Sequence, residues 1–531
     1  SRRRCFNAGS FRKNSITPPH PLLVLRGGCY PHETRKGFFL LSRKKESVKI
    51  NLTKIIFGKV EEMPSPKKIS IWVISFLLCL FFGNSVRISW GMTAEEEKKL
   101  GKKILLEIEK NVEWVRDLTL QAYINRIGHS LVAQVSPNPF EFKFYLINGT
   151  DPNAYAIPGG HIFLTTGLLV LTENEQEVAG VLSHEISHVM ARHVAQMIER
   201  GKRLNIATMA ALIAGVLLGG GKASEAVATT AMATAEALAL KYTREMEVEA
   251  DHTGLQYMVK AGYDPNGLIT FMNKIYKLSL TSGPKIPTYL STHPAIGDRI
   301  SLMENLLQTG PKPAGPFKTS GTYRKIQAKA FVEEREPHVT INHFQSMVDT
   351  SPQNVDAYYG LGLAYRKAGR LDKSIEAFQQ GHLLASKDRD VLRELGIAAF
   401  LSGKTDQAIQ NLEAVHSISR NGDDRSEDLS ALYYLGRSYQ EKGDFTRALP
   451  LFLKVKREHP GWIDVHHNLG SVYGRIGQKG LSHFYFAKYF KLKGENKSAL
   501  LHFRTSLDWL ERGSPEREEV QREIKELGGV K

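Results

Sequence analysis

The stretch "VLSHEISHVMARHVAQ", residues 181–196, contains the pattern from which the fold of the central region can be inferred. His184 and His188 are four residues apart, and Glu185 directly follows the first of them. Positions i and i+4 lie on one face of an α-helix, so both imidazoles can reach a single cation. The Glu185 side chain is rotated away from that face, but it can still reach a water molecule bound to the cation.

The spacing is that of the H-E-x-x-H motif, in which two histidines bind zinc and the glutamate acts as a general base. A metzincin would also need Gly and His at the positions of Ala191 and Val194, so that class is excluded. His193 points roughly half a turn away from His184, so we expect it to pack or to form a hydrogen bond rather than to bind the same ion. The motif therefore needs a third ligand from elsewhere in the chain.

The third ligand is expected from "KYTREMEVEADHTGLQYM", residues 241–258. Glu247 begins a helical pattern there, and Asp251 lies one turn later on the same face. We expect Glu247 to bind one zinc ion together with His184 and His188, with one position left to water. We expect Asp251 to hold a ligand histidine, His184, from behind, because such carboxylates fix the tautomer and the orientation of the ring.

Two other carboxylates of this stretch, Glu245 and Glu249, compete with Glu247 for the metal. A run of solvated charges is the alternative interpretation of the whole segment. Ala250 favours Glu247, because a small side chain next to it allows the helix to pack closely on its neighbour.

The segments before the H-E-x-x-H motif predict an α+β domain that is mainly helical and has a small β-sheet. Residues 93–134 show the apolar spacing of two amphipathic helices. Residues 140–148 and 153–171 alternate aromatic and β-branched residues around the Pro-Gly-Gly of residues 158–160, which indicates strands joined by a tight turn.

A second apolar segment, residues 204–219, is short and is interrupted by Asn205. We expect a buried or interfacial helix there rather than a membrane span, which needs about 20 apolar residues. The Ala-rich run to Leu240 would continue it as a helical hairpin. An interfacial helix would give the protein a peripheral membrane contact through residues 204–219. The alternative is an integral membrane protease, in which this segment and residues 69–82 are both inserted.

An internal repeat follows a Pro- and Gly-rich linker, residues 311–334. Leu-Gly pairs recur at separations of 34, 40 and 34 residues, and a second helix with a small residue and then an aromatic residue or leucine follows each pair. The pairs are Leu361-Gly362, Leu395-Gly396, Leu435-Gly436 and Leu469-Gly470. This spacing resembles the tetratricopeptide repeat (TPR). Residues 335–531 are therefore expected to form an all-α solenoid with a concave peptide-binding surface.

Charge and cysteine content exclude two classes of function. The first 68 residues contain 16 Lys/Arg and 4 Asp/Glu, so they carry +12 of the formal charge of +16, and a nucleic-acid-binding protein is not expected. The three cysteines, Cys5, Cys29 and Cys79, all precede residue 86. An exported protein that begins there has neither disulfides nor thiolate ligands, so a metal site must use histidine and carboxylate.

The N-terminal region has the order of a secretory signal peptide. From Met63, a short basic segment precedes an uncharged apolar run, residues 69–82, and small residues follow it. We expect residues 63–85 to be a cleaved leader and residues 1–62 to be an upstream extension. The alternative is an uncleaved membrane anchor, although the run is shorter than the ~20 residues of a comfortable span.

Four motifs occur in order: "NAYAIPGGHIFLTTGLL", "HEISH", "EVEAD" and "THPAIGDRI". Together they resemble the HtpX- and CAAX-prenyl-protease-like zinc peptidases, which implies a gluzincin-type metallopeptidase domain over residues 93–310. With the leader and the repeats, the chain most resembles the periplasmic branch of that family, the β-barrel assembly-enhancing type. The residues that match the family pattern for the metal and the general base are His184, Glu185, His188 and Glu247.

By the same resemblance, the strand after the Pro-Gly-Gly turn would be a sheet edge that binds the main chain of the substrate by β-augmentation. The residues of this expected edge are Gly159, Gly160, His161, Ile162 and Phe163. An edge of this kind contacts backbone rather than side chains, so specificity for substrate side chains should be loose.

The segment "STHPAIGDRI", residues 291–300, leaves three interpretations open. His293, with Arg299 nearby, could donate to the oxyanion of the reaction. Alternatively, His293 could occupy the open zinc position and hold the enzyme latent, or the loop could be purely structural. A protease of broad specificity must be kept from cleaving folded cell proteins, which motivates the hypothesis that His293 holds the enzyme latent.

These features predict a zinc metalloendopeptidase of the cell envelope, located in the periplasm or peripheral to a membrane. Its substrates would be unfolded, misfolded or misassembled polypeptides, in particular outer-membrane proteins. The solenoid would dock it on the outer-membrane assembly machinery and bind clients as a chaperone does. The alternative function is a TPR chaperone or adaptor for outer-membrane protein assembly in which proteolysis is secondary.

Overall fold

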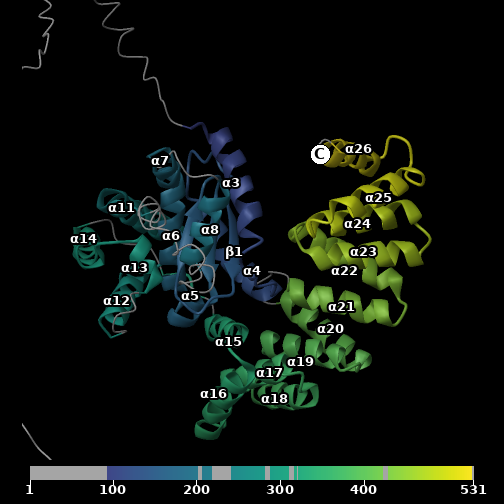
Figure 1. The fold of residues 1–531 in the computed structure, drawn as a ribbon. Helices are drawn as coiled ribbons and strands as arrows, with labels where there is room; N and C mark the ends of the chain where they lie inside the picture. The colour runs from purple at the N-terminus through teal and green to yellow at the C-terminus, as the bar shows by residue number, and fades with distance from the viewer. Residues whose placement is uncertain are drawn as a thin grey trace, which may run out of the picture. The chain divides into compact units, whose positions relative to one another are not determined.

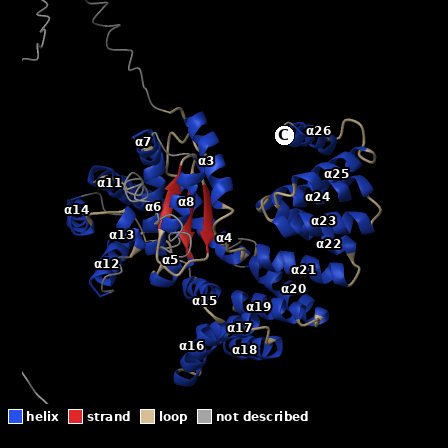
Figure 2. Cartoon of the chain, in the orientation of Figure 1, coloured by secondary structure: helices blue, strands red, loops and turns tan. Residues whose placement is uncertain are grey.

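The computed structural model describes residues 92–200, 206–217, 241–281, 287–309, 316–319, 321–421 and 428–528. The expected extension and leader, residues 1–62 and 63–85, lie outside the described residues. The described chain is mainly helical, with one three-stranded sheet before the metal-binding motif and helical repeats in its second half (Figures 1 and 2). The predicted fold class is therefore confirmed.

One helix, α6, lies at the centre of the first half of the chain. It packs against α4, α11, α12 and strand β2, and nearly all of its residues are buried. The Asn174 side chain caps its first turn by accepting a hydrogen bond from the Glu177 N–H. The described helices of this half are α3 (Ala94–Ile108), α4 (Leu118–Val132), α5 (Thr166–Leu171), α6 (Glu175–Met190), α7 (His193–Arg200), α8 (Ile206–Leu217), α11 (Arg244–Ala261), α12 (Asn266–Thr281), α13 (Thr288–Thr292) and α14 (Ile296–Thr309).

The sheet consists of β1 (Lys143–Ile147), β2 (Ala154–Ile157) and β3 (His161–Thr165) in the order β1-β3-β2 (Figure 2, red). Strand β3 pairs in parallel with β1 and antiparallel with β2. Gly159 and Gly160 make the turn between β2 and β3 with φ of 87° and 94°, a left-handed region that glycine adopts without strain. The predicted tight turn is confirmed.

The expectation that the strand after this turn forms the substrate-binding edge is wrong. Strand β3 is the central strand, and its backbone is paired with a neighbour on each side from His161 onward. A strand paired on both sides has no row of free N–H and C=O groups to offer a substrate. Ile162 and Phe163 are fully buried, and Gly159 and Gly160 belong to the turn. Of the described strands, β2 is the edge that packs on α6.

Helix α8 is the described part of the apolar segment at residues 204–219. Its Met209 and Ile213 are buried in a cluster with residues of α3 and the sheet. Residues 206–217 form a helix with buried residues, as expected, whereas the expected continuation to Leu240 lies outside the described residues. Within the described ranges, no helix combines the length and the apolar character that crossing a membrane requires.

The second half of the chain is a series of helices that follow one another in stacked pairs (Figure 1). This confirms the predicted TPR region. The helices are α15 (Tyr323–Glu334), α16 (Pro337–Thr350), α17 (Val355–Lys367), α18 (Leu371–Leu384), α19 (Arg389–Leu401), α20 (Thr405–Asn421), α21 (Leu429–Glu441), α22 (Phe445–Glu458), α23 (Ile463–Arg475), α24 (Lys479–Leu492), α25 (Asn496–Leu507) and α26 (Pro515–Gly528).

The glycines of the Leu-Gly pairs allow the two helices of a repeat to approach closely. A Cβ atom on Gly362 would lie 2.6 Å from the Phe378 ring, and one on Gly436 would lie 2.9 Å from the Phe452 ring. The small residue of the second helix serves the same packing, since the Ser374 hydroxyl donates to the Gly362 carbonyl at 2.8 Å. The repeated spacing therefore reflects close packing between paired helices.

The end of the expected linker, residues 311–334, is a helix and not a linker. Helix α15 buries Tyr323, Ile326 and Ala330 in the same core cluster as α6. The Pro- and Gly-rich residues stop before this helix, and the three buried side chains share one face at helical spacing. The repeats thus begin directly from a helix that is packed on the first half of the chain.

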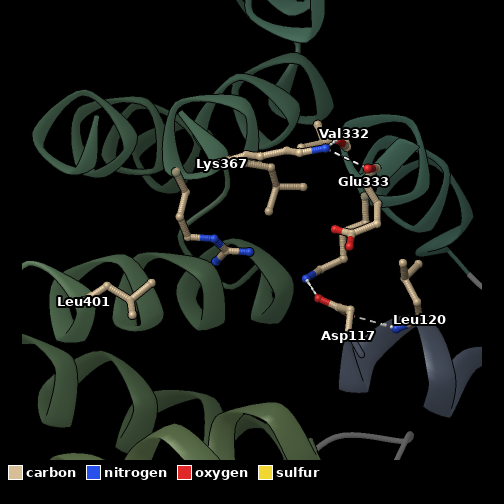
Figure 3. Close-up of a pocket in the computed structure, with 9 residues that line it drawn as sticks. Asp117, Leu120, Val332, Glu333, Lys367 and Leu401 are labelled. Atoms are coloured by element: carbon tan, nitrogen blue, oxygen red, sulfur yellow. Dashed lines mark hydrogen bonds and ion pairs between the residues drawn. The ribbon is translucent and has the colours of Figure 1, made fainter. Parts of the chain in front are cut away.

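Charged side chains join α15 to α4 and α19 around a pocket of about 280 Å³ (Figure 3). Lys329 of α15 donates to Asp117, the N-cap of α4, at 2.6 Å and lies 3.0 Å from Glu394 of α19. Lys367 donates to the carbonyl groups of Val332 and Glu333. Removal of one partner of such a buried pair leaves an uncompensated charge, so these contacts resist separation of the helices.

Candidate metal centre

Helices α6 and α11 bring four functional side chains into one buried cluster. His184, Glu185 and His188 come from α6, Glu247 comes from α11, and all four are fully buried. The helices approach closely, since a Cβ atom on Gly254 would lie 3.2 Å from the backbone nitrogen of His184. Position 254, one turn after Ala250 on α11, therefore has room only for a small residue.

The carboxylate that faces the two imidazoles is Glu247. Its oxygens lie 3.5 Å from His184 Nε2 and 3.4 Å from His188 Nε2. The competing Glu245 and Glu249 are exposed. The structure therefore places the sequence-predicted third ligand beside the motif and leaves its competitors outside the cluster.

His293 joins the same cluster from the segment between α13 and α14. Its Nδ1 atom lies 3.3 Å from His184 Nε2 and 3.1 Å from Glu247 Oε1, and its Nε2 atom lies 3.5 Å from Glu185 Oε1. One donor atom from each of His184, His188, Glu247 and His293 lies within 4.8 Å of the others.

The donor set fits a single zinc ion. Ligand atoms at 2.0–2.1 Å from a tetrahedral zinc are separated by about 3.3 Å. The two imidazole Nε2 atoms are 3.0 Å apart, and their distances to Glu247 are 3.4 and 3.5 Å. The fully buried Glu185 carboxylate makes no close side-chain hydrogen bond among the described residues, and His293 Nε2 lies 3.5 Å from its Oε1. A buried carboxylate of this kind fits a role in contacting the reacting water molecule better than a structural role.

Asp251 and Arg299 support the cluster from behind. Asp251 Oδ1 lies 2.9 Å from His184 Nδ1, which is the placement that the sequence predicts. The buried Arg299 donates to both Asp251 oxygens, at 2.6 and 2.7 Å, and its third nitrogen contacts Glu247. Because its N–H groups face these two carboxylates, the geometry favours a positioning role for Arg299 over oxyanion donation.

Three tyrosines that sequence reasoning missed lie over the cluster. The Tyr242 ring stacks on His188 with centroids 3.8 Å apart, and the Tyr289 ring stacks on His293 at 4.4 Å. Tyr155 of β2 lies 6.0 Å from Tyr242. The hydroxyl groups of all three are buried and have no hydrogen-bond partner among the described residues. Only Tyr289, four residues before His293, carries a sequence signal, because helical spacing puts the two residues on one face.

The carboxylates of the cluster have opposite electrostatic environments. Burial raises the pKa of Glu185, and the nearby charge of Glu247 adds to this effect. Burial alone would also raise the pKa of Glu247, but His293 and Arg299 outweigh it and hold the pKa well below its usual range. The lowered pKa favours the ionised form of Glu247, which a metal ligand requires, whereas the raised pKa of Glu185 favours its role as a proton acceptor.

The two ligand histidines also differ. Burial and the neighbouring His184 hold the pKa of His188 well below its usual range, so His188 is neutral. Burial would lower the pKa of His184 as well, but its hydrogen bonds with Asp251 and Glu247 outweigh burial and raise the pKa to about 9. Below that pH, a cation must displace one proton from His184.

The affinity for zinc should therefore depend on pH. We expect it to fall by up to about tenfold for each pH unit below 9, because one proton is released on binding. Above that pH the affinity should level off. Competition titrations with a chromophoric chelator, repeated across this pH range, measure the slope. A pH-independent affinity would show that His184 is already unprotonated.

The chain matches known families at both halves. Residues 118–307 match the model of peptidase family M48. This part of the chain is an M48 peptidase domain. Residues 327–382 and 388–457 match tetratricopeptide repeat models. The M48 domain contains every member of the metal cluster, and the predicted resemblance to zinc peptidases followed by TPR repeats is confirmed.

Relatives of the M48 domain are named proteases. The chain is 33% identical over 216 residues to the beta-barrel assembly-enhancing protease of Yersinia pestis, covering 40% of this chain and 44% of that protein. It is 31% identical over 212 residues to the protein of the same name in Escherichia coli (strain K12), covering 40% and 43%. It is 30% identical over 203 residues to the mitochondrial metalloendopeptidase OMA1 of Schizosaccharomyces pombe, covering 38% and 57%. The matches thus span about half the length of these relatives.

Proposed function

We propose that the protein is a zinc-dependent metalloendopeptidase of the cell envelope that hydrolyses misfolded or misassembled polypeptides. The observation that carries this proposal is the convergence of two imidazoles of α6 and the Glu247 carboxylate of α11 within 3.5 Å of one another, next to the fully buried Glu185 carboxylate. An M48 domain and relatives that are named proteases support the same reaction class.

His184, His188 and Glu247 are proposed to hold one zinc ion. When bound, the ion would lower the pKa of a water molecule and polarise the substrate carbonyl. Glu185 takes the proton of the attacking water and later delivers it to the leaving amine, a role for which burial has raised its pKa. Asp251 holds His184 through Nδ1, and Arg299 holds Asp251 and Glu247.

Strand β2 is proposed to bind the main chain of the substrate. It lies at the edge of the sheet, it packs on α6, and its residues Ala154–Ile157 pair only with β3 among the described strands. Backbone pairing of this kind makes few demands on the side chains of the substrate. Recognition of this kind is suited to client proteins that expose unpaired strands.

His293 is proposed to occupy the fourth ligand position and to keep the enzyme latent. Its Nδ1 atom is as close to His184 Nε2 and Glu247 Oε1 as the ligands are to each other. The stacked Tyr289 ring holds the imidazole in this position. Full burial of the cluster describes a closed site, so a substrate can reach it only after part of the surrounding chain moves, and the segment that carries His293 is proposed to be that part.

The clients and the location are proposed from the relatives and the repeats. Two relatives are named for the enhancement of β-barrel assembly, so we propose outer-membrane proteins as clients and the periplasm as the location. TPR solenoids bind peptides and proteins on their concave faces, and this solenoid is proposed to dock on the assembly machinery. Residues 63–85 would act as the leader for export.

Metal content and proteolysis of an unfolded substrate test the proposed function together. The purified chain should contain about one zinc per molecule and should cleave casein. Removal of zinc with a chelator should lower the cleavage rate by at least about 100-fold, and added zinc should restore it. Stoichiometric zinc without any cleavage by either the wild type or the His293→Ala variant, or cleavage that survives complete removal of metal, would contradict the proposal.

A further inference from the structure

We propose that His193 and Glu249 form a hydrogen-bonded relay that fixes His188 as a metal ligand, in the way that Asp251 fixes His184. The inference rests on the proposed function, because it assumes that His188 binds the cation. It gives a role to a histidine that the H-E-x-x-H motif does not include and to a carboxylate that does not reach the metal.

The side chains form a continuous chain of polar contacts. His193 Nδ1 lies 2.8 Å from His188 Nδ1, and His193 Nε2 lies 3.4 Å from Glu249 Oε2. His193 is only 1% exposed, whereas the Glu249 side chain is 62% exposed. The relay thus runs from the buried cluster to a carboxylate at the surface.

The direction of each hydrogen bond follows from the proton count of an imidazole. Two ring nitrogens 2.8 Å apart need one proton between them, so one nitrogen donates and the other accepts. His188 Nε2 faces Glu247 and the other ligands, and a coordinating nitrogen carries no proton. His188 Nδ1 therefore carries the proton and donates it to His193 Nδ1. The proton of His193 is then on Nε2, which faces the Glu249 carboxylate.

The backbone between α6 and α7 is shaped to give this contact. Arg192 has a φ of 59°, a left-handed conformation that is uncommon for a residue other than glycine. Its guanidinium group contacts the buried Glu97 carboxylate of α3 and the carbonyl group of Met92. This turn ends α6 and starts α7 at His193, so the ring of His193 meets His188 although the two residues are five positions apart.

With the relay, carboxylates of a single helix, α11, orient the rings of both ligand histidines. Glu247, Glu249 and Asp251 all belong to α11. Asp251 accepts from His184 directly, and Glu249 supports His188 through His193. Without His193, the buried Nδ1–H of His188 would lose its acceptor, which is costly in a site that excludes water. Partners of this kind fix the tautomer and the orientation of a ligand ring.

The affinity of the full chain for zinc, measured by chelator competition, tests the relay. His193→Leu should weaken zinc binding by about 10- to 100-fold. His193→Asn should restore most of the affinity, because the Asn amide oxygen occupies nearly the same position as Nδ1 and can accept the His188 proton. Glu249→Ala, at an exposed position that does not endanger folding, should weaken binding less than His193→Leu. Thermal unfolding of the apo forms checks that each variant is folded.

Wild-type affinity in His193→Leu would overturn the relay. Equal losses of zinc affinity in the Leu and Asn variants would also overturn the relay. Asn supplies a hydrogen-bond acceptor and Leu does not, so equal losses would mean that His193 acts through packing alone. If His193→Leu does not fold, Glu249→Ala decides, and unchanged zinc affinity in that variant would overturn the relay. A protein that binds zinc but cleaves nothing, both as the wild type and as His293→Ala, would contradict the peptidase alone, since the relay is judged by affinity.

Discussion

Glu185→Gln should reduce peptidase activity by about 10²- to 10⁴-fold, because Gln cannot take a proton from the attacking water. The substitution keeps the size of the side chain, and the described residues give Glu185 no close side-chain hydrogen bond that the amide would lose. His184, His188 and Glu247 are untouched, so the zinc content should remain that of the wild type. Initial rates of casein cleavage and metal analysis of the same preparation measure both quantities.

The matched control is Glu245→Gln, which makes the same chemical change at an exposed carboxylate of α11. It should leave both the rate and the zinc content unchanged. Activity that survives in Glu185→Gln with zinc bound would contradict the assigned general base. The same variant separates the two candidate functions: if outer-membrane integrity in cells survives the loss of proteolysis, the protein acts mainly as a TPR chaperone or adaptor.

His293→Ala should raise the rate of casein cleavage by about tenfold or more. This estimate assumes that roughly 10% or less of the wild-type molecules have an open site at any time. Removal of the side chain that closes the site would make nearly all molecules active, so the rate rises by the inverse of that fraction. His293 lies within 3.3 Å of His184 Nε2 and of Glu247, so its loss frees a position at the metal. The zinc content should stay near one per chain, because the other three ligands remain.

The direction of this change separates the three interpretations of the segment at residues 291–300. A decrease of the rate with zinc retained would identify His293 as an oxyanion donor. An unchanged rate would make the segment structural and would remove both functional interpretations. Ser291→Ala, an exposed change two residues earlier, is the control for general disturbance of this segment and should leave the rate unchanged.

Local patterns predicted that His184, His188, Glu247 and Asp251 would lie close together. Helical spacing placed His184 and His188 on one face, and the spacing of Glu247 and Asp251 placed one carboxylate at the metal and the other behind a ligand ring. In the structure, Glu247 lies 3.5 and 3.4 Å from the Nε2 atoms of His184 and His188, and Asp251 lies 2.9 Å from His184 Nδ1. Such predictions succeed because the geometry of a single helix is fixed by its hydrogen bonds, whatever the helix packs against.

Features that depend on which segments meet could not be predicted in the same way. The strand at His161 was expected at the edge of the sheet, but strand order depends on pairing between segments that no local pattern encodes. Helix α15 was included in the linker because its Pro- and Gly-rich neighbours dominated the composition of the segment. The tyrosines over the site were missed because stacking on His188 and His293 is a contact between separate elements.

The sequence by itself determined a metal-binding helix, its carboxylate partner helix and a TPR solenoid, because each follows from residue spacing along one or two neighbouring helices. Only the tertiary structure decided that β2 rather than β3 lies at the edge of the sheet, that His293 lies beside His184 and Glu247, and that His193 faces His188. These three depend on the way the chain turns between elements, for example at Arg192 with its positive φ. A turn of this kind is stabilised by distant partners such as Glu97, and periodicity along the chain carries no information about them.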